Sequence, residues 1–151
     1  MRKTVLAIIG CGRIANNAHF PAFEKMDNIR VKYACDIIKE KAEAIKESFP
    51  KIENVITDYN EALADPEVEA VFVLTPNYAH YSVSMAALKA GKHVFCEKPI
   101  TINYALSCEM AQKAQEKGKI LNIGVCNRYN DGVNKIKEII GNYISSVKAG
   151  E

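Results

Sequence analysis

The sequence lacks the features that would point to a disulfide framework, a nucleic acid or a membrane. Its five cysteines are odd in number, and no two of them form a Cys-x-x-Cys pair, so we expect reduced thiols and no metal site. A formal net charge of +2 argues against a nucleic acid or an acidic membrane surface as the partner. The apolar run near Met1 is too short for a signal peptide or a spanning helix. A cytoplasmic location is therefore expected.

Size and composition are those of an ordinary globular domain. The chain has 151 residues, of which 48% are hydrophobic and 25% charged. A chain of this length buries about two-thirds of its unfolded surface, which is enough for a core that needs no disulfide bonds or structural metal. No repeat, low-complexity segment or internal linker is visible, so one domain is expected.

Short apolar segments alternate along the chain with longer segments that carry one apolar face at helical spacing. Strands are predicted at about 4–9, 31–35, 54–57, 70–74, 93–96 and 120–125, and helices at about 13–26, 38–49, 60–64, 83–90, 106–114 and 133–140. Gly91, Gly118 and Gly141 are expected to end the last three helices. This alternation predicts an α/β fold of Rossmann type: a doubly wound parallel sheet of about six strands with helices on both faces.

The first strand ends in a glycine-rich loop that reads Gly-Cys-Gly-Arg-Ile-Ala from Gly10 to Ala15. Gly10 permits a sharp turn, Gly12 lets the backbone approach a pyrophosphate, and Ala15 is small enough for close packing of helix on strand. The pattern alone is weak, because glycines also form plain turns. At this position, between a strand and a helix, it favours a dinucleotide site.

The second strand ends in Asp36, which can accept hydrogen bonds from the adenine ribose and would repel the 2′-phosphate of NADP. The alternative is a solvated Asp that caps the next helix. Together with the glycine loop, Asp36 favours NAD as the cofactor, with NADP less favoured.

Two further segments follow strands at the same edge of the sheet. Thr75-Pro76-Asn77, with His80, follows the fourth strand, and Glu97-Lys98-Pro99 follows the fifth. A lysine there can orient the nicotinamide or protonate a substrate oxygen. The alternatives are a helix-capping Asn77, a surface His80 and a simple Glu–Lys pair in a loop.

These segments resemble the N-terminal domain of the glucose–fructose oxidoreductase, inositol dehydrogenase and rhizopine catabolism family (Gfo/Idh/MocA). The resemblance runs through nearly all of the chain, including 10–15, 70–80 and 122–129. Its most specific elements are Thr-Pro-Asn-x-x-His at 75–80 and Gly-Lys-His-Val-x-x-Glu-Lys-Pro at 91–99. It implies that Lys98 is the catalytic lysine beside nicotinamide and substrate, and that the Lys98-Pro99 peptide bond is cis.

The resemblance also assigns the remaining residues of the site. Thr75, Pro76, Asn77 and His80 would line the nicotinamide side, Glu97 would lie at the cofactor ribose, and Asn127 and Arg128 would lie at the substrate-facing rim. The cofactor is therefore expected to contact Gly10, Gly12, Arg13, Ile14, Asp36, Thr75, Pro76, Asn77, His80, Glu97 and Lys98.

The resemblance also implies a second, α+β domain that carries most substrate contacts, and we expect this sequence to lack it. We expect residues 1–142 to form the dinucleotide-binding domain and 143–151 to begin the crossover to the missing domain. The parent would transfer a hydride between NAD(H) and a sugar, polyol or related small molecule. This chain alone is expected to be inactive, and the alternative is a stand-alone, non-catalytic dinucleotide-binding or sensing module. An apolar surface near 120–144 is expected to lead to a homo-oligomer.

Overall fold

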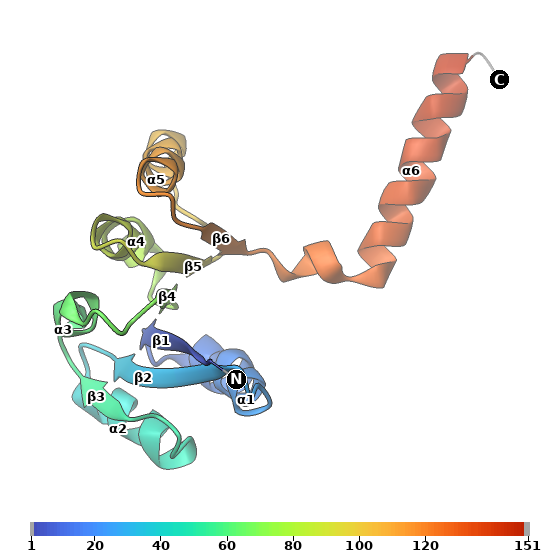
Figure 1. The fold of residues 1–151 in the computed structure, drawn as a ribbon. Helices are drawn as coiled ribbons and strands as arrows, with labels where there is room; N and C mark the ends of the chain where they lie inside the picture. Colours follow the sequence, from blue (N-terminus) through green and yellow to red (C-terminus); the bar gives the residue numbers. More distant parts are fainter. Residues whose placement is uncertain (1, 150–151) are drawn as a thin grey trace.

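The structure, a computed structural model that describes residues 2–149, is built on one parallel sheet of six strands (Figure 1). The strands are β1 (Thr4–Ile9), β2 (Ile29–Cys35), β3 (Asn54–Ile56), β4 (Ala70–Val73), β5 (His93–Glu97) and β6 (Leu121–Gly124). Their order is β3-β2-β1-β4-β5-β6, and each neighbouring pair is parallel. The predicted Rossmann-type sheet is confirmed, with each strand within two residues of its expected bounds.

Helices cover both faces of this sheet. The helical segments of the chain are η1 (Ala15–His19), α1 (Phe20–Glu24), α2 (Lys39–Ser48), α3 (Tyr59–Ala64), η2 (Asn77–Ala79), α4 (His80–Lys89), α5 (Tyr104–Glu116), η3 (Cys126–Tyr129) and α6 (Asp131–Ala149). One face packs on α3, α4 and α5 through a core that includes Val83, Leu88 and Met110. The other face packs on η1, α1 and α2, with Phe20 and Ile45 fully buried.

The helix predicted at 13–26 consists of two pieces. η1 is a π turn, in which the N–H of Phe20 donates to the carbonyl oxygen of Ala15, five residues earlier. The α-helix α1 follows directly, with Pro21 in its first turn as expected. His19 is the last residue of this π turn.

The strand β2 contains one extra residue relative to β1. Leu6 pairs with Val31, whereas the next residue, Ala7, pairs with Tyr33, so that Lys32 is left out of the pairing. The bulge changes the alternation of side chains along β2. Val31 and Ala34, three residues apart, therefore enter the same core.

Two of the three predicted helix ends are confirmed and one is wrong. Gly91 and Gly118 adopt left-handed conformations, with φ of +74° and +60°, just after α4 and α5. Gly141 does not end the last helix, because α6 continues to Ala149. The apolar period continues from Ile140 to Ile144, and a helix tolerates an internal glycine at a cost of about 1 kcal/mol.

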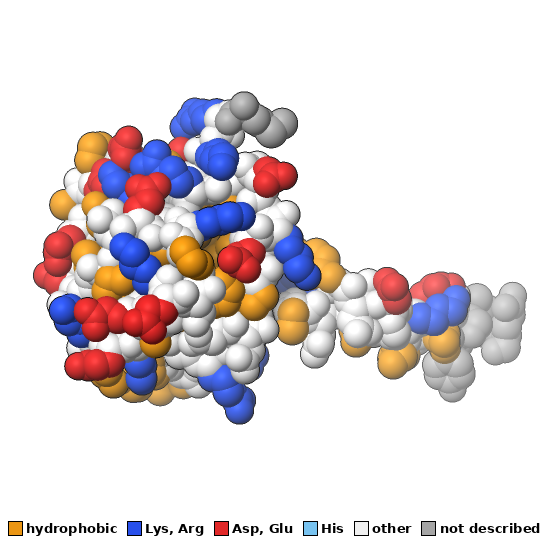
Figure 2. Space-filling view, turned by 90° about the horizontal axis from the view of Figure 1, so that it is seen from below, with side chains coloured by type: hydrophobic (Ala, Val, Ile, Leu, Met, Phe, Trp, Pro, Cys, Tyr) orange, Lys and Arg blue, Asp and Glu red, His pale blue; other side chains and the backbone are white. Residues whose placement is uncertain are grey.

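The helix α6 projects away from the sheet (Figure 1), and Figure 2 shows hydrophobic side chains along this arm. Ile136, Ile139, Ile140 and Ile144 are each about half exposed. The expected apolar surface is therefore present, and it lies mainly on α6. Within residues 2–149, no helix has both the length and the apolar character needed to cross a bilayer.

Candidate cofactor-binding site

A cavity of about 230 Å³ lies where β1, β2 and β4 end. Because β1 stands between β2 and β4, this is the point where the winding of the chain reverses. Ligands of open α/β sheets bind at such points. Four residues of the predicted cofactor set line the cavity: Gly10, Asp36, Thr75 and Pro76.

Gly10 occupies a position that only glycine fits. Its φ is +101°, and a Cβ atom there would lie 2.6 Å from the carbonyl carbon and oxygen of Leu74. Its N–H donates to the carbonyl oxygen of Cys35 over 2.8 Å. The loop is thereby held against the ends of both neighbouring strands.

Gly12, two residues later, faces open space. A Cβ atom there would meet no other atom within 4 Å. The Asn16 side-chain amide donates to the carbonyl oxygens of Cys11 and Gly12 over 3.2 and 3.0 Å, which fixes the loop. The loop is therefore firm and leaves room for a phosphate to approach the backbone, so it fits the expected dinucleotide.

Asp36 joins the glycine loop to the start of α2. Its Oδ2 accepts a hydrogen bond from the N–H of Cys11, and its Oδ1 accepts one from the N–H of Ile38, both over 2.9 Å. The alternative reading of Asp36 as the cap of α2 is wrong, because Ile38 is the N-cap of that helix and no side chain that the structure describes caps it. The bond to Ile38 is a local turn before the helix, and the same carboxylate lines the cavity. A carboxylate has about four acceptor positions, so acceptors remain for ribose hydroxyls.

The two thiols beside this loop are unreactive. Burial, aided by the charge of Asp36, raises the pKa of Cys11 and Cys35 to about 12. Both thiols stay protonated at neutral pH and act as small core residues.

The end of β5 forms a second hollow of about 360 Å³, lined in part by Ile14, His19, Glu97 and Gly124. The Oε1 atom of Glu97 lies 2.9 Å from Nε2 of His19, and its Oε2 accepts the N–H of Lys98 over 3.0 Å. A Cβ atom at Gly124 would lie 3.1 Å from Oε1 of Glu97. The glycine therefore leaves space for the contact between Glu97 and His19.

His80 lies beneath the surface of the site, with only 1% of its surface exposed. Its Nδ1 is 2.7 Å from the carbonyl oxygen of Pro99, and its Nε2 is 2.9 Å from that of Thr75. The histidine thus connects the loops that follow β4 and β5. The Lys98–Pro99 peptide bond is cis, which confirms that expectation.

All the predicted residues lie at the carboxyl ends of the strands, but not in one cavity. The first cavity is lined by Gly10, Asp36, Thr75 and Pro76, and the second by Ile14 and Glu97. Of the other predicted residues, Gly12 is partly exposed and His80 is buried. The exposed ones are Arg13, Asn77 and Lys98. Asn127 and Arg128 lie in η3, beyond β6. His19 received no role from sequence reasoning, since a histidine within a helix gives no signal of the face it occupies.

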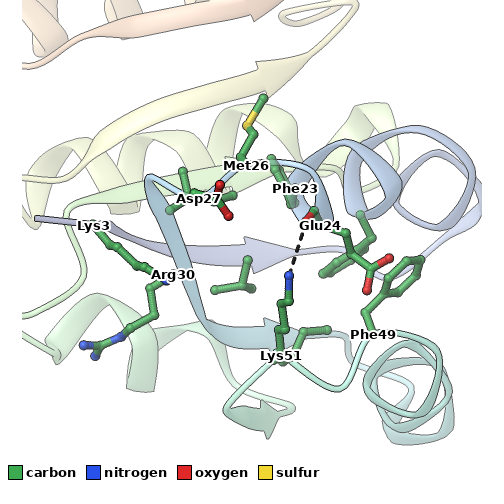
Figure 3. Close-up of a pocket in the computed structure, with 12 residues that line it drawn as sticks. Lys3, Phe23, Glu24, Met26, Asp27, Arg30, Phe49 and Lys51 are labelled. Atoms are coloured by element: carbon green, nitrogen blue, oxygen red, sulfur yellow. Dashed lines mark hydrogen bonds between the residues drawn. The ribbon is translucent and has the colours of Figure 1, made fainter. Parts of the chain in front are cut away.

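A further cavity of about 260 Å³ lies at the opposite, amino-terminal ends of β1 and β2 (Figure 3). Its walls combine apolar side chains such as Phe23 with charged ones such as Lys3 and Asp27. Nζ of Lys51 donates to the carbonyl oxygen of Glu24 across it, over 3.3 Å. Charges of both signs therefore surround this cavity, and it contains none of the predicted cofactor residues.

Comparison with known proteins gives consistent matches. Residues 5–125 match the family model for Gfo/Idh/MocA, described as an oxidoreductase family with an NAD-binding Rossmann fold. Inositol 2-dehydrogenase of Salmonella typhimurium is 32% identical over 135 residues, which are 88% of this chain and 40% of that protein. The uncharacterized oxidoreductase YrbE of Bacillus subtilis is 30% identical over 141 residues, covering 93% of this chain and 41% of that protein.

A solved structure gives the same picture. KijD10, a 3-ketoreductase from Actinomadura kijaniata in complex with NADP and TDP-benzene, matches with a TM-score of 0.85 and 26% sequence identity. The match covers 93% of this chain and 43% of KijD10. This chain therefore spans about 40% of the length of the relatives that it matches.

Proposed function

Because the chain belongs to the Gfo/Idh/MocA oxidoreductase family and forms its NAD-binding Rossmann domain, we propose that it binds NAD(H) across the carboxyl ends of β1, β2, β4 and β5. The observation that carries this proposal is the cavity shared by Gly10, Asp36 and Thr75. The pyrophosphate lies over Gly12, with Arg13 and Ile14 beside it. The adenine ribose hydroxyls donate to Asp36.

The nicotinamide lies on the side of Thr75, Pro76 and Asn77, facing Lys98. Lys98 is the residue that touches the reacting groups in this arrangement. Its side chain is exposed at the turn after β5. Glu97 contributes indirectly, since its carboxylate is bound to His19.

The proposed cofactor preference is NAD(H) over NADP(H). Asp36 places a negative charge where NADP carries its 2′-phosphate. Ile37 and Ile38 follow, are exposed, and offer no cation to pair with that phosphate. KijD10, a structural neighbour, was solved with NADP, so this preference is a property to be measured on this chain.

The parent activity is proposed as hydride transfer between NAD(H) and a hydroxyl-bearing carbon of a sugar, a polyol or a related small molecule, in the cytoplasm. Inositol dehydrogenases among the relatives support this substrate class. A homo-oligomer formed through the apolar stripe of α6, consisting of Ile136, Ile139, Ile140 and Ile144, belongs to the same proposal. Exposed apolar patches of this kind usually mark interaction sites.

The 151-residue chain alone is expected to bind cofactor without turning over substrate. Hydride transfer needs a substrate held in a near-attack geometry, and it needs an acid–base group within reach of the reacting hydroxyl. His19 and Glu97 are bound to each other, and both ring nitrogens of His80 face carbonyl oxygens. Lys98 remains as the exposed titratable group of its turn.

Calorimetric titration of the purified chain with NADH and with NADPH tests the proposal. The expected result is one site per chain, with NADH bound more tightly. Absence of binding by either cofactor would overturn the function, and equal or tighter binding of NADPH would overturn the preference. An absorbance assay with a panel of polyols and sugars completes the test, since Lys98-dependent turnover would contradict the expected inactivity.

A further inference from the structure

The turn that carries Lys98 is attached to the rest of the domain from both faces of the sheet. On one side, Glu97 binds His19, whose ring packs against Phe72 and Phe95 with centroid distances of 6.0 and 5.4 Å. On the other side, the carbonyl oxygen of Pro99 faces His80, the first residue of α4. Lys98 lies between these two attachment points in the chain.

The side chain of Lys98 has no attachment of its own. Within residues 2–149 it makes no hydrogen bond or ion pair, and it is exposed. Its direction therefore depends on its backbone. That backbone is held by its own N–H, which donates to Glu97, and by the neighbouring Pro99 carbonyl, which faces His80.

Each histidine reaches its partner through a specific local structure. His19 is the last residue of the π turn η1, and π turns occur mostly as single insertions at functional sites. Successive residues of an α-helix are rotated by about 100°, so a residue inserted or lost in this turn would change the direction of the imidazole. His80 is fully buried, and both of its nitrogens lie within hydrogen-bond distance of main-chain oxygens.

We propose that His19 and His80 are positioning residues that hold the Lys98 turn from opposite faces of the sheet and thereby aim Lys98 at the nicotinamide. His19 acts through Glu97, and His80 acts through the Pro99 carbonyl oxygen while it also holds Thr75. This inference rests on the proposed function. It replaces the direct cofactor contact expected for His80 and Glu97 by an action through Lys98.

A double-mutant cycle on NADH affinity tests this inference. The variants are His19→Phe, which keeps a ring but removes the partner of Glu97, and His80→Gln, which removes the ring that lies between the two carbonyl oxygens. Each is measured alone and combined with Lys98→Ala. His93→Gln is the matched control, because His93 lies at the amino-terminal end of β5, where its Nδ1 accepts the N–H of Ile120.

If the histidines act through Lys98, each single variant weakens NADH binding by about three- to tenfold, and by less than about twofold in the Lys98→Ala background. His93→Gln is expected to change the affinity by less than about twofold in either background. Equal losses in both backgrounds would overturn the inference, and so would a Lys98→Ala variant that binds NADH like the wild type.

Failure of the proposed function gives a different result, since the wild-type chain would then not bind NADH at all. Thermal unfolding of every variant separates a loss of affinity from a loss of fold. If His80→Gln does not fold, the cycle with His19→Phe decides the question, because this residue is less buried and its substitution keeps the aromatic packing.

Discussion

Charged side chains are arranged differently at the two ends of the sheet. At the amino-terminal end, Lys32 lies 2.5 Å from both Asp65 and Glu67, and Arg30 lies 2.8 Å from Glu67. The buried Lys92 donates to the carbonyl oxygen of Asp65 over 2.7 Å. At the carboxyl-terminal end, the first cavity is lined by Gly10 and by the partly exposed Asp36, to which no cation among the described residues is bound.

This difference separates stability from binding. The charges at the amino-terminal end satisfy one another: hydrogen bonding to Asp65 and Glu67 raises the pKa of Lys32, and the hydrogen bond from Lys32 lowers the pKa of Asp65 to about 2. Burial lowers the pKa of Lys92. At the other end, open backbone positions and spare acceptors remain for a ligand. Substitutions at the two ends should therefore affect different measurements.

Gly10→Ala should have the largest effect, and it should break the separation of stability from binding. The new Cβ would overlap the backbone of Leu74 at a positive φ, so the variant should lose roughly 3 kcal/mol of unfolding free energy in chemical denaturation. Gly12→Ala is the matched control, because its Cβ meets nothing in the free chain. It should change stability by less than about 0.5 kcal/mol yet weaken NADH binding about tenfold or more. Normal NADH affinity in Gly12→Ala would remove the loop from the pyrophosphate site.

Asp36→Ala should sharpen the comparison between the two ends of the sheet through its effect on NADH binding. Loss of the ribose hydrogen bonds should weaken NADH binding by roughly 1–3 kcal/mol, measured by calorimetry, with a smaller effect on NADPH. Asp58→Ala provides the control, since Asp58 caps α3 through the N–H of Asn60 over 2.9 Å but does not line the cavity. A loss of affinity as large in Asp58→Ala as in Asp36→Ala would mean that losing a local bond to the N–H two residues later explains the effect.

Asp65→Ala, unlike Asp36→Ala, should affect stability and not binding. It should lower the unfolding free energy by roughly 1–2 kcal/mol while NADH affinity stays unchanged. Glu69→Ala, which breaks an exposed ion pair with Arg2, should cost less than about 0.5 kcal/mol. The pH dependence follows from the depressed pKa of Asp65 in the folded state. Its stabilising contribution is present above its ordinary pKa of 3.8 and is lost as the pH falls toward 2.

Denaturation curves between pH 5 and pH 2 check this dependence, with the pH range taken from those two pKa values. The wild-type chain should lose more stability over this range than Asp65→Ala does. Identical losses in the two proteins would show that Asp65 does not stabilise the folded chain through its charge.

The smallest effect on the fold is expected on α6, which lies outside this comparison. Ile140→Gln should change the unfolding free energy by less than about 0.5 kcal/mol, because the side chain is half exposed. It should nevertheless reduce self-association, measured by light scattering at increasing concentration. Glu138→Gln, on the opposite side of the helix, is the control. A wild-type chain that is monomeric at high concentration would contradict the proposed oligomer.

Most of the fold could be predicted from the sequence because short-range patterns determine it. The apolar run from Thr4 to Ile9 and the helix ends at Gly91 and Gly118 need only neighbouring residues to specify them. Gly141 shows the limit of that approach. Glycine alone does not end a helix, and the apolar face of α6 continues beyond it.

The positions of the candidate site's residues could be predicted more readily than their contacts. Gly10 and Asp36 follow strands directly and line the cavity, so their positions could be inferred. The contacts of His19, His80 and Glu97 join segments far apart in the sequence, and they depend on packing across the sheet. Such long-range contacts leave no periodic signal in the sequence.

The bulge in β2 has a consequence for how related sequences can vary. Lys32 is left out of the pairing with β1, so a residue gained or lost on its amino-terminal side can be absorbed there without moving the rest of the strand. From Tyr33 onward an inserted or deleted residue cannot be absorbed in this way, because a shift by one residue would turn each later side chain to the opposite face. Related chains should therefore differ in length before Lys32. They should keep the three-residue interval from Tyr33 to Asp36, which brings Asp36 to the glycine loop.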